Sequence, residues 1–146
     1  MKKLSCLFIL ALLFISAASA GNYITPGTGI RWNLDDLVTY SGGSVTFSAG
    51  QYNVIDTVKI SATDTLMITS DATVKFAKNT FLAARGTLII NPPTGVLFTA
   101  QNTADGYYGM RIDTSSSTLL RKLTFEYAVS LKITDCSPTL DSCIIQ

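Results

Sequence analysis

The feature of this sequence that most constrains its fold is a recurrence of short strand-like patterns at a nearly constant interval. Each pattern has an apolar residue at every second position, which is typical of a β-strand with one buried face. Clusters of Ser, Thr, Asp, Asn and Gly lie between the patterns and predict turns. The same number of residues separates Leu66 from Leu88, Ile68 from Ile90, Ile90 from Ile112, and Phe76 from Phe98. The interval is slightly shorter from Ile112 to Ile133 and from Phe125 to Ile145, and longer from Phe98 to Phe125.

A repeat of this length favours a solenoid. Its coils bring equivalent strands into parallel register and bury their apolar sides in one continuous core. The alternative is an antiparallel sandwich or barrel, which does not require a constant register to hold through successive intervals. We therefore expect an all-β fold, a parallel β-helix with roughly 20–22 residues per coil. An inserted turn is expected near Ser115–Thr118, where the interval is longest.

Residues 1–20 differ from the rest and predict a secretory signal peptide. Met1-Lys2-Lys3 is a short positive start, Leu7–Ile15 is an unbroken apolar run, and Ala18-Ser19-Ala20 supplies the small residues of a cleavage site. The apolar run is shorter than the roughly 20 residues that a membrane crossing needs. We expect cleavage between Ala20 and Gly21. The product is then secreted, extracellular or held at the cell surface, and no membrane span remains in it.

The sequence predicts that residues 21–43 form an extended lead-in segment followed by a short helix that caps the solenoid. Asn33 is a suitable N-cap, and Asp35 and Asp36 fall in the first turn, where the helix dipole favours negative charge. The helical pattern covers Trp32–Val38 and stops near Ser41-Gly42-Gly43. Residues 44–146 are predicted to form the coils. The pattern reaches Gln146 without a second cap, so we expect the β-helix to be open at its C-terminal end.

Several motifs between residues 64 and 128 match a known pattern. They are Asp64-Thr65-Leu66-Met67-Ile68, Arg85-Gly86-Thr87-Leu88-Ile89-Ile90, Tyr107-Tyr108-Gly109-Met110-Arg111-Ile112 and Leu123-Thr124-Phe125-Glu126-Tyr127-Ala128. The stretch resembles secreted bacterial proteins of the right-handed parallel β-helix, pectin-lyase-like class, of the Bacteroidetes type, and corresponds to their N-terminal part. The resemblance implies a right-handed coil. It does not imply one function, because the fold hosts lyases, glycosidases, adhesins and structural shafts.

The charge and composition exclude several kinds of site. Beyond Lys2 and Lys3 there are nine Lys and Arg against ten Asp and Glu, so the net charge gives no attraction to nucleic acid or anionic lipid. Histidine is absent from the chain, which excludes Ser/His and Cys/His pairs. We find no cofactor motif and no metal-binding cysteine spacing. Cys136 and Cys143 are expected to be free thiols rather than a disulfide closing a short loop.

Four residues are candidate ligand-binding positions. Asp113 and Asp135 are one coil apart in the sequence; stacked on adjacent coils, they could bind calcium or act as an acid/base pair. The alternative is that both shape turns, with Thr134 rather than Asp135 beside Asp113. Tyr107 and Tyr108 could stack on sugar rings, or they could pack over the neighbouring coil.

No catalytic cluster emerges from this set, and Glu126 is expected to make a structural hydrogen bond. We therefore hypothesise a non-enzymatic, exported β-helix module that is structural or adhesive. Its expected partners are a polysaccharide or cell-surface glycan, and a second copy through the open C-terminal coil. The alternative is the N-terminal portion of a polysaccharide lyase or glycoside hydrolase whose active site lies on further coils.

Overall fold

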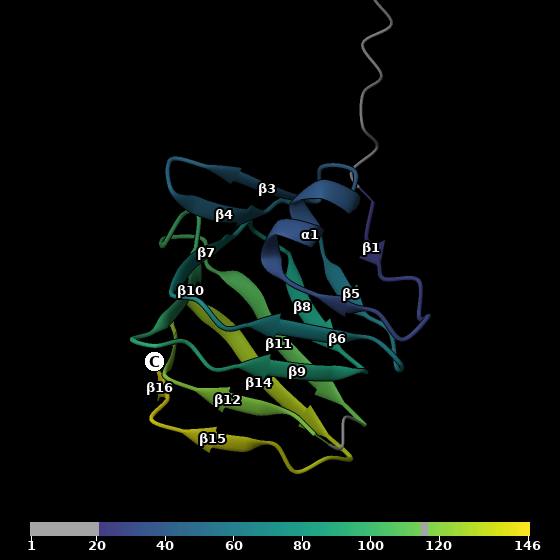
Figure 1. The fold of residues 1–146 in the computed structure, drawn as a ribbon. Helices are drawn as coiled ribbons and strands as arrows, with labels where there is room; N and C mark the ends of the chain where they lie inside the picture. Colours follow the sequence, from purple (N-terminus) through teal and green to yellow (C-terminus); the bar gives the residue numbers. More distant parts are fainter. Residues whose placement is uncertain (1–20, 115–116) are drawn as a thin grey trace, which may run out of the picture.

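The computed structural model describes residues 21–114 and 117–146, so the predicted signal peptide and its cleavage site at Ala20 lie outside the described residues. The described residues form one helix and three sheets (Figure 1). Sheet 1 contains β1 (Tyr23–Ile24), β5 (Val58–Ile60), β8 (Phe81–Ala84), β11 (Tyr107–Asp113) and β14 (Ala128–Thr134). Sheet 2 contains β2 (Arg31–Trp32), β6 (Thr65–Ile68), β9 (Thr87–Ile90), β12 (Leu119–Arg121) and β15 (Thr139–Asp141). Sheet 3 contains β3 (Val45–Ser48), β4 (Gln51–Val54), β7 (Ala72–Phe76), β10 (Val96–Ala100), β13 (Leu123–Phe125) and β16 (Ile144–Ile145).

The chain passes through sheets 3, 1 and 2 in the same order in each of four successive coils. These coils are β4-β5-β6, β7-β8-β9, β10-β11-β12 and β13-β14-β15. Every strand pair that joins one coil to the next is parallel. The predicted all-β parallel β-helix is therefore confirmed.

The predicted register is confirmed in part. The confirmed pairs are Leu66 with Leu88, Ile68 with Ile90, Ile112 with Ile133, Phe98 with Phe125, and Phe125 with Ile145. The pairs that the structure corrects are Ile90 with Ile112 and Phe76 with Phe98. Ile90 instead pairs with Leu120, and Phe98 pairs with Val74.

The length of the third coil explains why Ile90 does not pair with Ile112. The third coil is longer than the second mainly because the loop between β10 and β11 exceeds the loop between β7 and β8. A smaller addition lies between β11 and β12. The larger part of the insertion therefore lies before β11, and only its smaller part lies between β11 and β12, where the sequence predicted an inserted turn.

The N-terminal end of the solenoid is covered by residues 21–48 (Figure 1). β1, β2 and β3 each occupy the edge of one sheet, and α1 (Leu34–Tyr40) contacts β3 and β6. The predicted Asn33 N-cap is confirmed: its side chain accepts from Asp36 N, and Asn33 N donates to the Asp36 carboxylate. Trp32 belongs to β2, so the helix begins later than predicted. β3 is antiparallel to β4, and parallel coiling therefore begins at β4 rather than at residue 44.

The core is a stack of side chains along the solenoid axis. Tyr107 lies parallel to Phe76 with 4.6 Å between the ring centroids, and it meets Phe125 edge-on at 5.8 Å. Phe76 also meets Phe98 at 5.3 Å. Each fully buried apolar side chain of this size stabilises the fold by about 1.5–3 kcal/mol. At the last coil the same positions are open: Ile133 and Ile145 are 41% and 53% exposed.

Asp64 attaches the N-terminal segment to the first coil. Its buried carboxylate accepts hydrogen bonds from Gly27 N at 2.9 Å, Gly29 N at 2.9 Å and Ile30 N at 3.0 Å. Burial by itself would raise the pKa of the Asp64 carboxyl, but the hydrogen bonds from the Thr25 side chain and the three amides outweigh it. The pKa of this carboxyl is therefore held below its ordinary value.

Gly86 occupies the corner beneath this contact. A Cβ at Gly86 would overlap the backbone carbonyl oxygens of Asp64 and Ser61. We expect Gly86→Ala to lower the free energy of unfolding by about 2–3 kcal/mol, because the backbone must shift to accept the methyl group. Gly95→Ala is the control, since the nearest atom to its Cβ is 3.6 Å away, and it should change stability by no more than about 0.5 kcal/mol. Equal effects in urea denaturation would contradict the close approach at Gly86.

Replacing Asp64 with Asn should destabilise the fold by about 1–3 kcal/mol at pH 7, because amide donors lose their acceptor. The pKa of Asp64 is lowered on folding, so its contribution is present above the unfolded value of 3.8 and is lost as the pH falls through the folded value. The free energy of unfolding of Asp64→Asn should accordingly fall less than that of the wild type below about pH 4. Asp135→Asn makes the same substitution at an exposed corner after β14 and is the matched control.

Candidate functional site

One row of side chains crosses the outer face of sheet 1. The register places at equivalent positions Ile24 on β1, Lys59 on β5, Ala83 on β8, Arg111 on β11 and Lys132 on β14. Lys59 alternates with buried Val58 and Ile60, which places its side chain on the outside. Three cations from three different coils therefore share one row.

A groove lies across this row at the ends of the strands. It encloses about 330 Å³, and the residues used below are Ile24, Lys59, Phe81, Arg85, Arg111 and Asp113. Ala83 lies between Lys59 and Arg111 in the row, and its short side chain leaves room between the two longer ones. Arg85 follows β8 at the corner, while half-buried Phe81 and exposed Ile24 add apolar surface.

The groove is locally cationic although the described chain is not. Lys59, Arg85 and Arg111 line it together with a single carboxylate, and Lys132 extends the row on β14. Four of the nine Lys and Arg beyond residue 20 thus lie on sheet 1 or at its corner. Such clustering attracts negatively charged ligands even when the net charge is near zero.

Asp113 is the carboxylate of the groove. It is 9% exposed, and its Oδ2 lies 2.6 Å from Arg111 Nε. The buried Oδ1 has no hydrogen-bond partner in the part of the chain that the structure describes. A buried acceptor of this kind is uncommon in folded proteins and calls for an explanation.

The predicted stacking of Asp113 on Asp135 is not formed. Asp113 pairs with Thr134, which is the alternative register that the sequence left open. Asp135 lies at the exposed corner after β14 with φ 53°, a left-handed conformation that Asp adopts more readily than most residues. The prediction that Asp113 and Asp135 form an acid/base or calcium-binding pair is therefore wrong, and Asp135 shapes a turn.

The two candidate tyrosines have different environments. Tyr107 is 1% exposed within the aromatic stack, so it packs in the core and does not present a ring to a ligand. Its hydroxyl is buried without a hydrogen-bond partner among the described residues, and burial, with a smaller contribution from the charge of Glu126, raises its pKa. Tyr108 is 52% exposed, but it is not among the residues that line the groove.

The other predicted polar groups have structural contacts. Glu126 accepts from Thr99 Oγ1 at 2.9 Å and from Gln146 Nε2 at 3.2 Å, so the expected structural hydrogen bond is confirmed. Cys136 and Cys143 are free, as predicted, and both are partly buried. The Cys143 thiol lies 3.2 Å from the carbonyl oxygen of Leu120.

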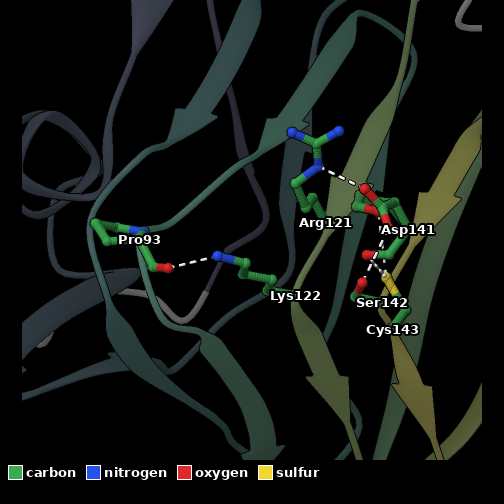
Figure 2. Close-up of polar contacts among 7 residues, drawn as sticks. Pro93, Arg121, Lys122, Asp141, Ser142 and Cys143 are labelled. Atoms are coloured by element: carbon green, nitrogen blue, oxygen red, sulfur yellow. Dashed lines mark hydrogen bonds and ion pairs between the residues drawn. The ribbon is translucent and has the colours of Figure 1, made fainter.

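A second polar cluster lies at the corner between sheets 2 and 3 (Figure 2). Arg121 Nε contacts Asp141 Oδ2 at 2.7 Å, and Lys122 Nζ donates to the carbonyl oxygen of Pro93 at 2.5 Å. The Ser142 hydroxyl and Arg121 lower the pKa of Asp141. Arg121 and Lys122 each bind a protein group of another coil, so the cluster is structural, and the sheet 1 groove remains the candidate site.

Sequence reasoning missed most of this groove. Asp113 was singled out, whereas Lys59, Arg85 and Phe81 were not. The available signal was one basic residue in each of three separate strands, Lys59, Arg111 and Lys132, but its meaning depends on knowing that these strands form one sheet.

Comparison with family models, curated proteins and solved structures finds no significant match to this chain. Among the described residues, no helix is both long and apolar enough to cross a membrane. The same residues contain no group of three or more His, Cys, Asp or Glu side chains that could hold a metal ion. The function is accordingly argued from the geometry of the groove.

The buried Tyr107 hydroxyl leads to a stability prediction. Tyr107→Phe should leave the free energy of unfolding unchanged or raise it by up to about 1 kcal/mol, because it removes an unpaired buried polar atom. Tyr107→Ala should lower it by about 3–5 kcal/mol, because it leaves a cavity in the aromatic stack. Urea denaturation distinguishes the two variants. A large loss in Tyr107→Phe would mean that the hydroxyl has a stabilising partner.

Proposed function

We propose that this protein is a non-enzymatic, exported β-helix module of the cell surface or extracellular space that binds an acidic glycan. Support for export is the charged and apolar pattern of residues 1–20. The observation that carries the binding proposal is the sheet 1 groove, where Lys59, Arg85 and Arg111 meet the apolar side chains of Phe81 and Ile24.

This combination suits a charged sugar polymer. Guanidinium and ammonium groups bind carboxylate or sulfate oxygens, and Arg does so with several donors in a fixed geometry. The C–H face of a sugar ring can pack on Phe81, which is half-buried in the groove wall. The residues that line the groove come from β1, β5, β8 and β11, so a linear chain lying across them can contact several coils.

A binding role is favoured over catalysis by the state of Asp113. It is the one carboxylate among the groove-lining residues, and Arg111 already holds one of its oxygens at 2.6 Å. The other oxygen of Asp113 is buried, so neither oxygen is free to contact a ligand in the groove. The groove therefore offers recognition without an evident general base.

Affinity electrophoresis of the purified chain tests this function. Binding to alginate, a polyuronate, is expected, and it should weaken as salt screens the charges. Neutral dextran should not retard the protein. Lys59→Ala and Arg111→Ala should each reduce alginate affinity about tenfold or more, because a hydrogen bond to a charged group contributes about 1.5–3 kcal/mol.

Lys75→Ala is the matched control, since Lys75 lies on β7 in sheet 3 and should leave binding unchanged. Equal retardation by dextran and alginate, or no effect of the groove variants, would contradict the proposed site.

A further inference from the structure

The cation row of sheet 1 continues past the groove onto the next coil. Lys132 on β14 pairs with Arg111 on β11, but it is not among the residues that line the groove. The residues on either side of Lys132 pair with Met110 and Ile112 of the core, so its side chain faces outward beside that of Arg111. Lys132 is exposed, and it forms no ion pair within residues 21–114 and 117–146. A ligand anion that extends beyond Arg111 can therefore bind this ammonium group.

An irregularity in β11 turns an aromatic side chain toward the same face. Gly109 has φ 116°, a conformation that other residues rarely adopt, and a Cβ at this position would overlap the carbonyl oxygen of Ser130. Tyr107 and Met110 are both buried in the core, so two residues instead of one lie between these inward-facing positions. Tyr108 follows inward-facing Tyr107 and faces outward, with 52% of it exposed.

The backbone of Tyr108 is fixed beside the groove. Its amide donates to the carbonyl oxygen of Thr80 at 3.0 Å, and the next residue on β8, Phe81, lines the groove and pairs with Gly109. The ring of Tyr108 contacts no other aromatic ring among the described residues. An exposed tyrosine on a fixed backbone can pack against the C–H face of a sugar at a low cost in conformational entropy.

Tyr108 and Lys132 together repeat the chemistry of the groove one coil further on. In the groove, Phe81 supplies apolar surface while Lys59 and Arg111 supply cations. We propose that Tyr108 and Lys132 form a second subsite, which binds a further unit of the same acidic glycan chain. The inference rests on the proposed function, and it makes the ligand an extended polymer along the solenoid axis rather than a single sugar acid.

Substitutions at the two positions should weaken alginate binding in different ways. Tyr108→Ala and Lys132→Ala should each lower the affinity about fivefold, the loss caused by removing an energetically important interface contact. Lys132→Ala should also make binding less sensitive to salt, because one screened charge contact is removed. Tyr108→Ala should keep the wild-type salt sensitivity. Tyr108→Phe should keep the wild-type affinity, because the ring and not the hydroxyl makes the contact.

Two matched controls test whether these losses are local. Tyr40 is 65% exposed on α1, Lys75 lies on β7 in sheet 3, and neither lines the groove. Tyr40→Ala and Lys75→Ala should leave the alginate affinity and its salt sensitivity unchanged. Thermal unfolding verifies that each variant is folded.

Competition on the wild-type protein tests the length of the ligand without any variant. Mannuronate, a monomer of alginate, and alginate fragments of increasing length compete with the polymer. Fragments that reach both subsites should compete more strongly than the monomer, per sugar unit, by about tenfold or more, because the second contact becomes intramolecular.

The outcomes separate the second subsite from the groove. If Lys59→Ala and Arg111→Ala weaken alginate binding while Tyr108→Ala and Lys132→Ala do not, the second subsite is overturned and the proposed function stands. Equal competition by the monomer and the long fragments would overturn the extended ligand in the same way. Absence of alginate binding by the wild-type protein would overturn the proposed function, and this inference with it.

Discussion

Parallel backbone hydrogen bonding between successive coils is the constraint on which the rest of this structure depends. It fixes which residue of one coil lies over which residue of the next, and so it builds the aromatic stack inside and the row of cations outside. The pairing of β8 with β11 sets Ala83 beside Arg111, and the same strand pair sets Ala84 beside Ile112 in the core. A slip of one residue would exchange the inner and outer faces of a strand. Core and groove therefore have the same structural origin.

The corners make this regularity possible. Lys122, Tyr127 and Ser142 have φ values of 51°, 58° and 56°, so short left-handed turns redirect the chain from one sheet to the next. Lys122 and Ser142 each follow a strand of sheet 2, one coil apart. Corners this short leave little conformational freedom between the strands that they join.

The sequence predicted features that depend on neighbouring residues and missed those that depend on the path of the chain between sheets. The N-cap at Asn33 and its partner Asp36 belong to the same helical turn, and they were visible directly. The stacking of Leu66 on Leu88 followed from a constant interval. Ile112 was wrongly paired with Ile90 because the loop before β11 is longer than its equivalent before β8. No local pattern reveals that two strands of similar composition lie in different sheets.

The same limit explains the site. Asp113 could be recognised as a polar residue at the end of a strand, but its neighbour could not be chosen between Thr134 and Asp135 without the register. Lys59 and Arg111 are distant in the sequence and share no motif. Their relation exists only because each occupies the same position on sheet 1, two strands from each other.

The row on sheet 1 also sets a length scale. Neighbouring strands lie about 4.8 Å apart, so Lys59 and Arg111 are attached to backbones roughly 9–10 Å apart along the solenoid axis. Side-chain motion changes where each charge ends, but the spacing of the attachment points is fixed by the backbone. The backbone therefore fixes the order and the spacing of Lys59, Arg111 and Lys132 along the solenoid axis. A linear polymer lying along this face would meet the three side chains in that order and at that spacing.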